Sequence, residues 1–260
     1  MPVELTILGS GSSGNSAYLE TGECRLLIDA GLSGRQIRQR LLSINRAPEN
    51  LNGILITHEH SDHIQGLTVL AAKLRIPVYC NRQTRDAIVA AQQLQYDFRI
   101  FDTGSTFDLG DMAVETFGVP HDAYDPVGFM IRTAGARIGF VTDLGHATKL
   151  VIQRVRPSNV LVIEANHDVQ MLENDPRRPW SLKQRILSRH GHLSNEAAAT
   201  AIEEIVSAEL GHVFLAHLSR DCNRPEIAHE VVSTRLLGMG ATHVRLHTTD
   251  QATPNATLVL

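Results

Sequence analysis

Three histidines and one aspartate lie within six residues, in the segment Thr-His-Glu-His-Ser-Asp-His at residues 57–63. Imidazole and carboxylate groups are the usual protein ligands of zinc, manganese and iron. Histidine makes up only 13 of the 260 residues, so a solvated turn that gathers three of them by chance is a poor explanation. The segment therefore predicts a metal site.

This segment offers more ligands than a single ion requires. His58 and His60 suit one ion, whereas Asp62 and His63 suit a second ion. Two ions need further ligands, and polar residues follow apolar runs in three predicted loops, at His121, Asp143 and His217. A single residue of this kind is usually structural. The ordered set indicates a centre for two divalent ions per chain, with zinc, manganese and iron all compatible.

The elements that must position these residues are short apolar strands that alternate with amphipathic helices. Strands are expected over residues 3–8, 25–29, 53–57, 77–80, 112–117, 127–133, 136–142, 160–164 and 213–216, and near 244–246 and 257–260. Helices are expected over residues 33–44, 64–74, 83–95 and 194–207, and after Pro225. Residues 112–142 have the pattern of an antiparallel meander, so the fold class is α/β with mixed sheets.

The loop at residues 9–15 is rich in glycine and serine and invites comparison with a phosphate-binding loop. It lacks the Gly-Lys-Ser/Thr ending of that motif, and a strand rather than a helix is expected after it. A nucleotide-binding loop is therefore not expected here.

The composition is that of a globular protein, with 43% apolar and 20% charged residues. It excludes disordered, collagen-like and coiled-coil chains. No apolar run approaches the roughly 20 residues that span a bilayer, and no signal-peptide pattern is present, so a cytoplasmic location is expected. Three widely spaced cysteines do not make a disulfide framework. The net charge of −4 argues against a protein that coats nucleic acid by bulk charge.

The ordered ligand set resembles the five-motif pattern of the metallo-β-lactamase superfamily. Asp29, in Leu-Ile-Asp-Ala-Gly, matches the first motif of that pattern, a buried aspartate that supports the ligand loop. The resemblance covers nearly the whole chain. It implies a four-layer αβ/βα sandwich, with two mixed β-sheets flanked by helices and residues 1–260 forming one domain.

The resemblance also implies how the ligands are shared between two ions. Each ion takes three terminal ligands and one aspartate bridges them: His58, His60 and His121 for the first ion, Asp62, His63 and His217 for the second, and Asp143 as the bridge. The sequence differs from the patterns of other branches of the superfamily, which argues against the activities of those branches. β-Lactamases carry cysteine where Asp143 stands, and flavodiiron oxidoreductases carry glutamate where His60 stands. Glyoxalase II ends in a helical domain, whereas two strands are expected here after Gly240.

Four short segments resemble the YycJ/WalJ subfamily of bacterial exonucleases, which act 5′→3′ on double-stranded DNA: residues 9–16, 163–168, 191–195 and 216–219. The order Glu164, His192, His217 is also similar to that in tRNA 3′-processing endonucleases. In those enzymes the matching glutamate and histidine help to protonate the leaving group. Their long exosite arm is not evident in this chain.

The implied chemistry is hydrolysis of a phosphodiester, with Asp62, Glu164 and His192 as the expected catalytic residues. Two ions about 3.5–4 Å apart can share a hydroxide and stabilise the entering and leaving oxygens. Glu164 beside His192 would keep that imidazole protonated as a general acid. The alternative for His192 is helix capping or packing near Ser194. His167 is expected either to support the site from behind the ligands, to contact substrate, or to be structural.

Five cations lie within 13 residues without an intervening acid: Arg177, Arg178, Lys183, Arg185 and Arg189. They lead directly to the loop of His192 and are expected to bind a DNA backbone, a solvated face being the alternative. Trp180, in the same run, is expected to stack on a terminal base, to join the core or to hold the loop. A further substrate contact, to a terminal phosphate, is expected from Ser12, Ser13 and Asn15, with a tight turn as the alternative.

The sequence thus predicts a dinuclear phosphodiester hydrolase, acting as a 5′→3′ exodeoxyribonuclease through a metal-bridging hydroxide. DNA is the expected substrate, with RNA left open. Two alternatives remain at this stage. One is a hydrolase of a small ester or cyclic phosphodiester with the same metal centre. The other is a metal-binding regulatory protein without catalysis.

Overall fold

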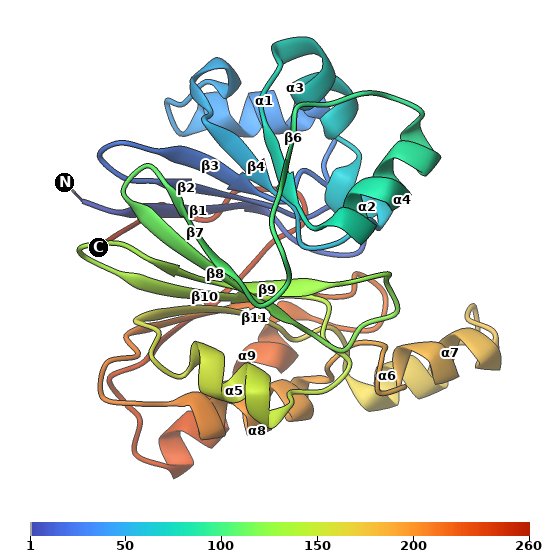
Figure 1. The fold of residues 1–260 in the computed structure, drawn as a ribbon. Helices are drawn as coiled ribbons and strands as arrows, with labels where there is room; N and C mark the ends of the chain where they lie inside the picture. Colours follow the sequence, from blue (N-terminus) through green and yellow to red (C-terminus); the bar gives the residue numbers. More distant parts are fainter. Residues whose placement is uncertain (1) are drawn as a thin grey trace.

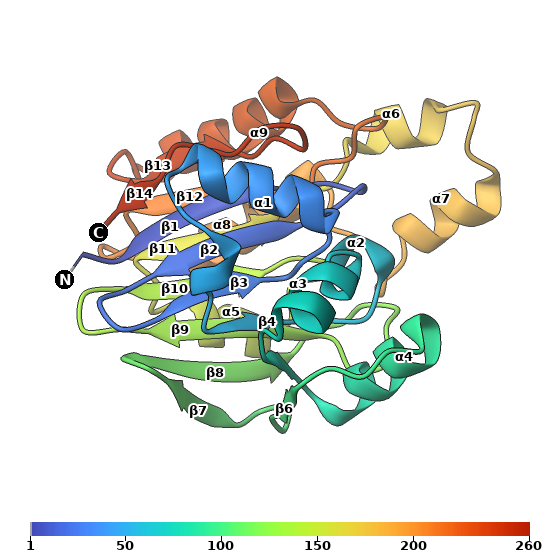
Figure 2. The ribbon, with the colours of Figure 1, turned by 90° about the horizontal axis from the view of Figure 1, so that it is seen from above.

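The computed structural model describes residues 2–260. Two seven-stranded sheets pack face to face, and helices cover their outer faces (Figure 1). Figure 2 shows the same layers from above. The four-layer αβ/βα sandwich and the mixed sheets expected from the sequence are therefore confirmed.

The first sheet has the strand order β14-β1-β2-β3-β4-β5-β6. Strands β14, β1, β2 and β3 pair antiparallel, and β3 to β6 pair parallel. The strands are β1 (Glu4–Gly9), β2 (Ser16–Glu20), β3 (Arg25–Ile28), β4 (Gly53–Leu55), β5 (Val78–Cys80), β6 (Phe98–Ile100) and β14 (Leu258–Val259). The helical segments on this side are α1 (Gly34–Ser43), η1 (Pro48–Asn50), α2 (Ser61–Ile64), α3 (Leu67–Leu74) and α4 (Arg82–Gln92).

The second sheet has the order β13-β12-β11-β10-β9-β8-β7. The meander β7 to β10 is antiparallel, and β10 to β13 are parallel. The strands are β7 (Thr106–Leu109), β8 (Met112–Gly118), β9 (Val127–Arg132), β10 (Arg137–Val141), β11 (Val160–Glu164), β12 (His212–Ala216) and β13 (Arg245–Thr248). The helices are α5 (Lys149–Val155), α6 (Val169–Asn174), α7 (Trp180–Ile186), α8 (Asn195–Ile205) and α9 (Pro225–Gly238).

The central core lies between the sheets and draws on both of them. Leu5 of the first sheet belongs to the same buried cluster as Phe129 and Phe214 of the second. Burial of each such side chain contributes about 1.5–3 kcal/mol. Separate apolar clusters lie under the helices on each outer face. The shared core supports the proposal that the chain forms a single domain.

Helices α6 and α7 stand apart from the layers, at one end of the sandwich (Figure 1). The cationic run begins in the loop between these two helices, continues through α7 and ends just after it, and the sequence reveals it as a charge pattern and not as an element. Helices α5, α6 and α7 have six or seven residues each, too few for a helical period to be recognised. The edge strands β6 and β7 were also not expected, because most of their residues are exposed or half-buried and show no apolar run.

One predicted helix is divided in the structure. The sequence predicts a continuous helix over residues 64–74, but α2 ends before α3 begins. The carbonyl groups of Asp62 and His63 accept hydrogen bonds from the backbone N–H groups of Asn15 and Ala30. The chain therefore cannot continue a regular helix through this point, and Asp62 and His63 lie inside a short helical turn.

Within residues 2–260, no helix has the length and apolar character that a membrane span requires. The cytoplasmic location stays a prediction from the sequence.

Candidate active site

The ligand candidates and Asp29 lie where strands of both sheets end. Asp29 follows β3, Asp143 lies two residues after β10, and His217 follows β12. These three residues have φ angles of 60°, 55° and 54°, in the left-handed region that side chains with a Cβ rarely adopt. The other non-glycine residues of this kind between residues 2 and 260 lie at helix ends. Strain of this type is typical of functional sites.

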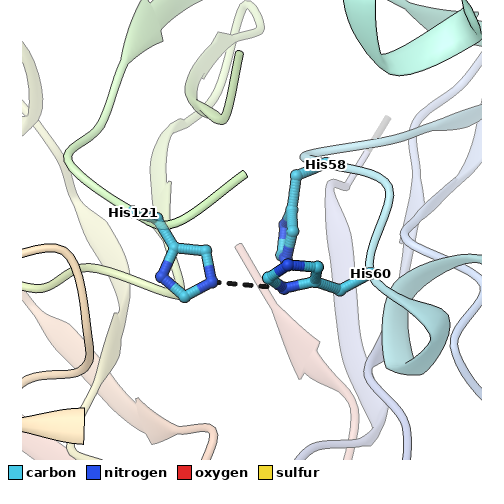
Figure 3. A group of neighbouring side chains, drawn as sticks. All are labelled: His58, His60 and His121. Atoms are coloured by element: carbon cyan, nitrogen blue, oxygen red, sulfur yellow. Dashed lines mark hydrogen bonds between the residues drawn. The ribbon is translucent and has the colours of Figure 1, made fainter. Parts of the chain in front are cut away.

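The first ligand group consists of three histidines from two loops, His58, His60 and His121. Figure 3 shows their rings facing a common point. Nδ1 of His60 lies 3.3 Å from Nε2 of His121. On the other side of its ring, His121 donates from Nδ1 to the carbonyl oxygen of Gly191 at 3.0 Å. That bond leaves Nε2 of His121 free to bind a metal ion.

His58 provides the test of whether a metal fits this site. Its Nδ1 lies 3.0 Å from the hydroxyl oxygen of Thr57, whose own proton goes to Asp29. Burial lowers the pKa of His58 well below its usual value, so the ring is neutral. Its Nε2 is buried and has no hydrogen-bond partner in the described part of the chain. A lone pair without a partner, turned toward two other histidines, fits a divalent cation.

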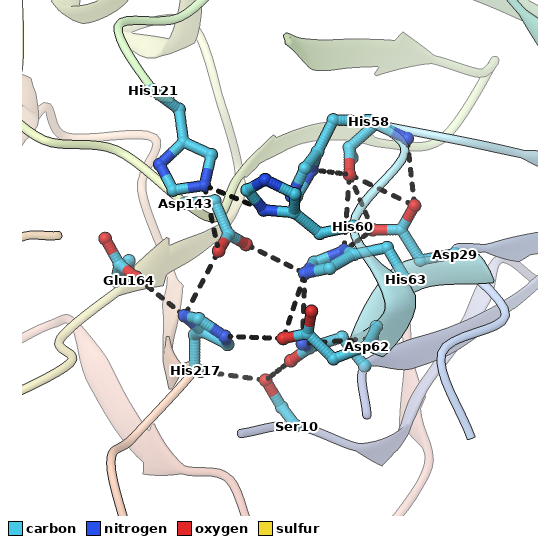
Figure 4. Close-up of polar contacts among 12 residues, drawn as sticks. Ser10, Asp29, His58, His60, Asp62, His63, His121, Asp143, Glu164 and His217 are labelled. Carbon is cyan, nitrogen blue, oxygen red and sulfur yellow. Dashed lines mark hydrogen bonds and ion pairs between the residues drawn. The ribbon is translucent and has the colours of Figure 1, made fainter. Parts of the chain in front are cut away.

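The second ligand group joins the two sheets and consists of Asp62, His63 and His217. Nε2 of His217 lies 3.4 Å from Oδ2 of Asp62. His63 donates from Nδ1 to Oδ2 of Asp29 at 2.8 Å, which leaves its Nε2 facing the cluster (Figure 4). Asp29 therefore fixes the ring of His63 and does not belong to the groups of ligand candidates.

Asp143 lies between the two groups. Its Oδ2 is 3.1 Å from Nε2 of His63, and its Oδ1 is 3.4 Å from Nδ1 of His217 and 3.8 Å from Nε2 of His121. The carboxylate therefore reaches ligands of both groups (Figure 4). All seven ligand candidates come together in the structure, in an arrangement that suits two ions sharing one aspartate.

Glu164 ends β11 and is fully buried beside this cluster. Its Oε1 lies 2.7 Å from Nδ1 of His192 and 2.7 Å from Nδ1 of His217. Its Oε2 accepts hydrogen bonds from the backbone N–H groups of Leu144 at 3.0 Å and Leu193 at 2.9 Å. The carboxylate is thus completely hydrogen-bonded, which is the condition for keeping a charge in the interior.

These contacts decide the charge of the pair. Burial acts to raise the pKa of Glu164, but the charge of His192 and the hydrogen bonds from both histidines lower it to about 2. Burial acts to lower the pKa of His192, yet the nearby carboxylate raises it above the ordinary value. The ionised glutamate therefore favours a protonated imidazole at His192.

A cleft of about 360 Å³ opens over the cluster. Its walls include the ligand candidates His60, Asp62, Asp143 and His217, together with His192. The ligand candidates, the hydrogen-bonded pair of Glu164 and His192, and a cavity of ligand size therefore lie in one place. That combination is the usual signature of a hydrolytic active site.

Comparison with known proteins agrees with this geometry. The model of a family described as "Beta-lactamase superfamily domain" matches residues 24–217. The chain belongs to the metallo-β-lactamase superfamily. It is 41% identical over 265 residues to an exodeoxyribonuclease YycJ of Bacillus anthracis, covering 98% of both chains. It is 42% identical over 258 residues to an exodeoxyribonuclease WalJ of Streptococcus pneumoniae, covering 96% of both.

A solved structure of a metallo-β-lactamase fold protein, YhfI of Bacillus subtilis, superposes with a TM-score of 0.75. That match has 15% identity and covers 100% of this chain and 99% of the other, so it concerns the fold alone. The resemblance inferred from the sequence is confirmed. Since the curated relatives are named as nucleases, the expectation of an enzyme is confirmed as well.

The structure places some of the predicted substrate contacts in the cleft and others away from it. Arg178 and Arg185 line the cleft. Arg185 is paired with Asp122, and Arg177 and Arg178 are both paired with Asp175 and Asp221, so the acid-free run acquires acidic partners on folding.

Lys183 differs from the prediction. It is 7% exposed, and its Nζ donates to the carbonyl oxygen of Glu173 at 2.7 Å. The side chain therefore holds α7 against α6 and does not present its charge to a substrate.

Asn15 also differs from the prediction. It is buried, and its side chain is hydrogen-bonded to Ser10, Gly11 and Asp62, so it has no group left for a terminal phosphate. Ser12 does line the cleft, whereas Ser13 is exposed and donates from its backbone to Gln251. A tight turn, the alternative for this loop, explains Asn15 better.

The structure also decides the open alternatives for His192 and Trp180 and describes the surroundings of His167. Ser194 caps α8, so His192 is not a helix cap. Trp180 is 58% exposed and is not a core residue. His167 is buried, and neither ring nitrogen has a hydrogen-bond partner among residues 2–260.

Sequence reasoning missed several residues of the site. Asp122 and Asn166 line the cleft, and Asn166 donates to the carbonyl oxygen of His217 at 2.8 Å. Asp122 directly follows a ligand candidate, which was an available signal. Ser10 accepts a hydrogen bond from the backbone N–H of His217 at 2.8 Å, a contact over 207 positions that no local pattern reveals.

Proposed function

We propose that this chain is a dinuclear metal-dependent phosphodiester hydrolase that acts as a 5′→3′ exodeoxyribonuclease. The observation that carries the proposal is the position of His192, which is held by Glu164 in the cleft that also contains the ligand cluster. The identity of 41–42% with proteins named exodeoxyribonucleases supports the choice of DNA.

In this proposal His58, His60 and His121 hold one ion, and Asp62, His63 and His217 hold the other, with Asp143 serving both. Bound divalent ions would neutralise the charge of a phosphodiester and lower the pKa of a water molecule. Asp29 and Glu164 prepare the site by engaging Nδ1 of His63 and of His217. Each ring then offers Nε2 to the cluster.

His192 acts on the leaving group. Its Nδ1 proton is engaged by Glu164, so Nε2 is the nitrogen left for a substrate in the cleft. A proton donated from Nε2 to the departing 3′-oxygen prevents build-up of charge on that oxygen. Glu164 stays ionised and compensates the charge of the imidazolium before the transfer.

Arg178 and Arg185 bind the phosphates next to the scissile bond. Both line the cleft, and both guanidinium groups are paired with acids that a phosphate can replace. The exposed Trp180 lies on the same helix as Arg185 and offers a stacking surface for a base. The 5′→3′ polarity of the proposed reaction is carried over from the YycJ/WalJ exonucleases, which the chain resembles at residues 9–16 and 191–195.

Purified protein with Mn²⁺ or Zn²⁺ and DNA labelled at either the 5′ or the 3′ end tests the proposal. Release of mononucleotides from the 5′ end, ahead of any loss of the 3′ label, is the expected result. Single-stranded DNA and RNA of the same sequence serve as comparison substrates. Turnover of a cyclic phosphodiester without DNA degradation would contradict the proposal and favour a small-molecule hydrolase.

A further inference from the structure

The loop between β1 and β2 connects the two halves of the ligand cluster. The backbone N–H of His217 donates to Oγ of Ser10 at 2.8 Å, a contact drawn in Figure 4. Oγ of Ser10 in turn donates to Oδ1 of Asn15 at 2.9 Å. Ser10 is 5% exposed and Asn15 is 4% exposed, so water does not compete for these bonds.

Asn15 continues the connection into the first sheet. Its backbone N–H donates to the carbonyl oxygen of Asp62 at 2.8 Å, and its Nδ2 lies 3.1 Å from Nε2 of His63. Nδ2 also has the carbonyl oxygen of Gly11 within 3.2 Å, so it keeps an acceptor when Nε2 of His63 binds an ion. A continuous set of hydrogen bonds thus runs from His217 to the turn that carries Asp62 and His63.

The loop is fixed from behind by the C-terminal segment. The N–H of Ser10 donates to the carbonyl oxygen of Asp250 at 3.1 Å, and Nε2 of Gln251 donates to that of Gly14 at 2.8 Å. The buried guanidinium of Arg40 donates to the carbonyl oxygens of Leu8 and Gln251. With anchors on both sides, the loop has little freedom to move.

Close approach of backbones makes this arrangement specific. A Cβ atom on Gly31 would lie 1.5 Å from the carbonyl oxygen of Asp62 and 2.7 Å from the nitrogen of Asn15. It would therefore separate the two atoms whose hydrogen bond links the loop to the ligand turn. Only glycine allows that bond at this position.

We propose that Ser10 and Asn15 are positioning residues of the metal centre, which set the placement of His217 relative to Asp62 and His63. They thereby control the affinity for the ion that these three residues bind. The inference rests on the two-ion centre of the proposed function. Removal of the Ser10 hydroxyl leaves the buried N–H of His217 without an acceptor, so the loop bearing this ligand must shift.

The other ion serves as an internal reference. Its ligands, His58, His60 and His121, make no hydrogen bond to Ser10 or Asn15 within residues 2–260. Removal of the Ser10 hydroxyl therefore weakens one ion site and not the other, whereas a general decrease in stability weakens both.

The test is a calorimetric titration of metal-free protein with Mn²⁺. In Ser10→Ala, the affinity of one of the two binding steps falls by about 10–100-fold, the usual effect of removing a partner behind the ligands. The other step is unchanged, and Ser10→Thr, which keeps the hydroxyl, restores the weakened step. Ser158→Ala is the matched control, because Ser158 is a fully buried serine whose hydroxyl bonds to Val155 at the other end of β11.

Asn15→Ala provides a second measurement that does not depend on the folding of Ser10→Ala. It keeps the backbone bonds of residue 15 and removes only the side chain, and it lowers the affinity of the same step. An equal fall in both steps, no change in either, or the same effect in Ser158→Ala overturns the inference. A single step in the wild-type protein overturns the two-ion centre as well, while the DNA-end assay judges the nuclease activity separately.

Discussion

His192 and His217 both place Nδ1 2.7 Å from the same carboxylate oxygen, Oε1 of Glu164. A single buried glutamate thus engages one nitrogen of each ring and leaves the other free. For His217 the free nitrogen faces Asp62 in the ligand cluster, and for His192 it remains for the cleft. One residue therefore contacts both the ligand candidate His217 and the proposed general acid His192.

The first prediction concerns His192. His192→Ala slows DNA cleavage by roughly 10²–10⁴-fold, the usual contribution of a positioned general acid. A nitrophenyl phosphodiester is affected much less, because its leaving group departs without a proton. Single-turnover rates on both substrates, with metal content determined for each protein, make the comparison. An equal decrease on both substrates would show that His192 is structural.

A second prediction concerns metal content. Elemental analysis of the wild-type protein gives two ions per chain, because two groups of three ligand candidates lie on either side of Asp143. Asp143→Ala loses more than one ion, since its carboxylate reaches both groups. Asp125→Ala, in the loop after His121 but bonded to Thr103 instead of to the cluster, keeps both ions. One ion in the metal-replete wild-type protein would refute the two-ion centre.

Substrate binding provides the third prediction. Neutralising Arg178 and Arg185 together weakens DNA binding, and the log–log salt slope becomes shallower by about 0.7–0.9 for each phosphate that the protein no longer neutralises. Fluorescence anisotropy at several salt concentrations measures both effects. Turnover of a nitrophenyl diester stays near the wild-type rate, because the ligand cluster is untouched.

The matched control for this pair replaces Arg38 and Arg235, which are also paired with acids, Glu49 and Glu203, but do not line the cleft. This control has the same change in net charge. If it flattens the salt slope equally, the effect reflects overall charge and not a binding site in the cleft.

The fourth prediction concerns acid sensitivity. Burial lowers the pKa of His167 from 6.5 to about 4. The unfolded chain therefore takes up this proton more readily than the folded one, so the stabilisation present above pH 6.5 is lost as the pH falls towards 4. His167→Phe removes this part of the pH dependence while keeping an aromatic ring in the buried space.

Urea unfolding of the metal-free proteins between pH 7.5 and 4.5 measures the difference. The free energy of unfolding of His167→Phe falls less steeply over this range than that of the wild type. His190→Phe, at an exposed histidine, follows the wild-type curve. Parallel curves for wild type and His167→Phe would mean that His167 does not titrate as its burial requires.

The ligand candidates and the mixed α/β class could be predicted from the sequence because both depend on local chemistry, whereas the four-layer order was implied by the resemblance to the metallo-β-lactamase superfamily. Histidine and aspartate at residues 58–63 are suitable metal ligands wherever the segment lies, and apolar runs of strand length must pair into sheets. The pattern of His121, Asp143 and His217 after such runs placed them at strand ends, where the structure has them. The short elements α5, α6 and α7 escaped prediction because a helical period needs more residues than they have.

Only the tertiary structure decided which distant residues these side chains contact. The cationic run has no acid within it, yet Arg185 pairs with Asp122, and Lys183 turns inward to the backbone of Glu173. Asn15, expected at a substrate phosphate, instead joins Ser10 to the turn of Asp62. Such contacts depend on how two sheets pack, because hydrogen bonds form over about 3 Å whatever the separation along the chain. The sequence by itself therefore determined which reactive side chains are present, and the packing of the sheets decided which of their atoms come together.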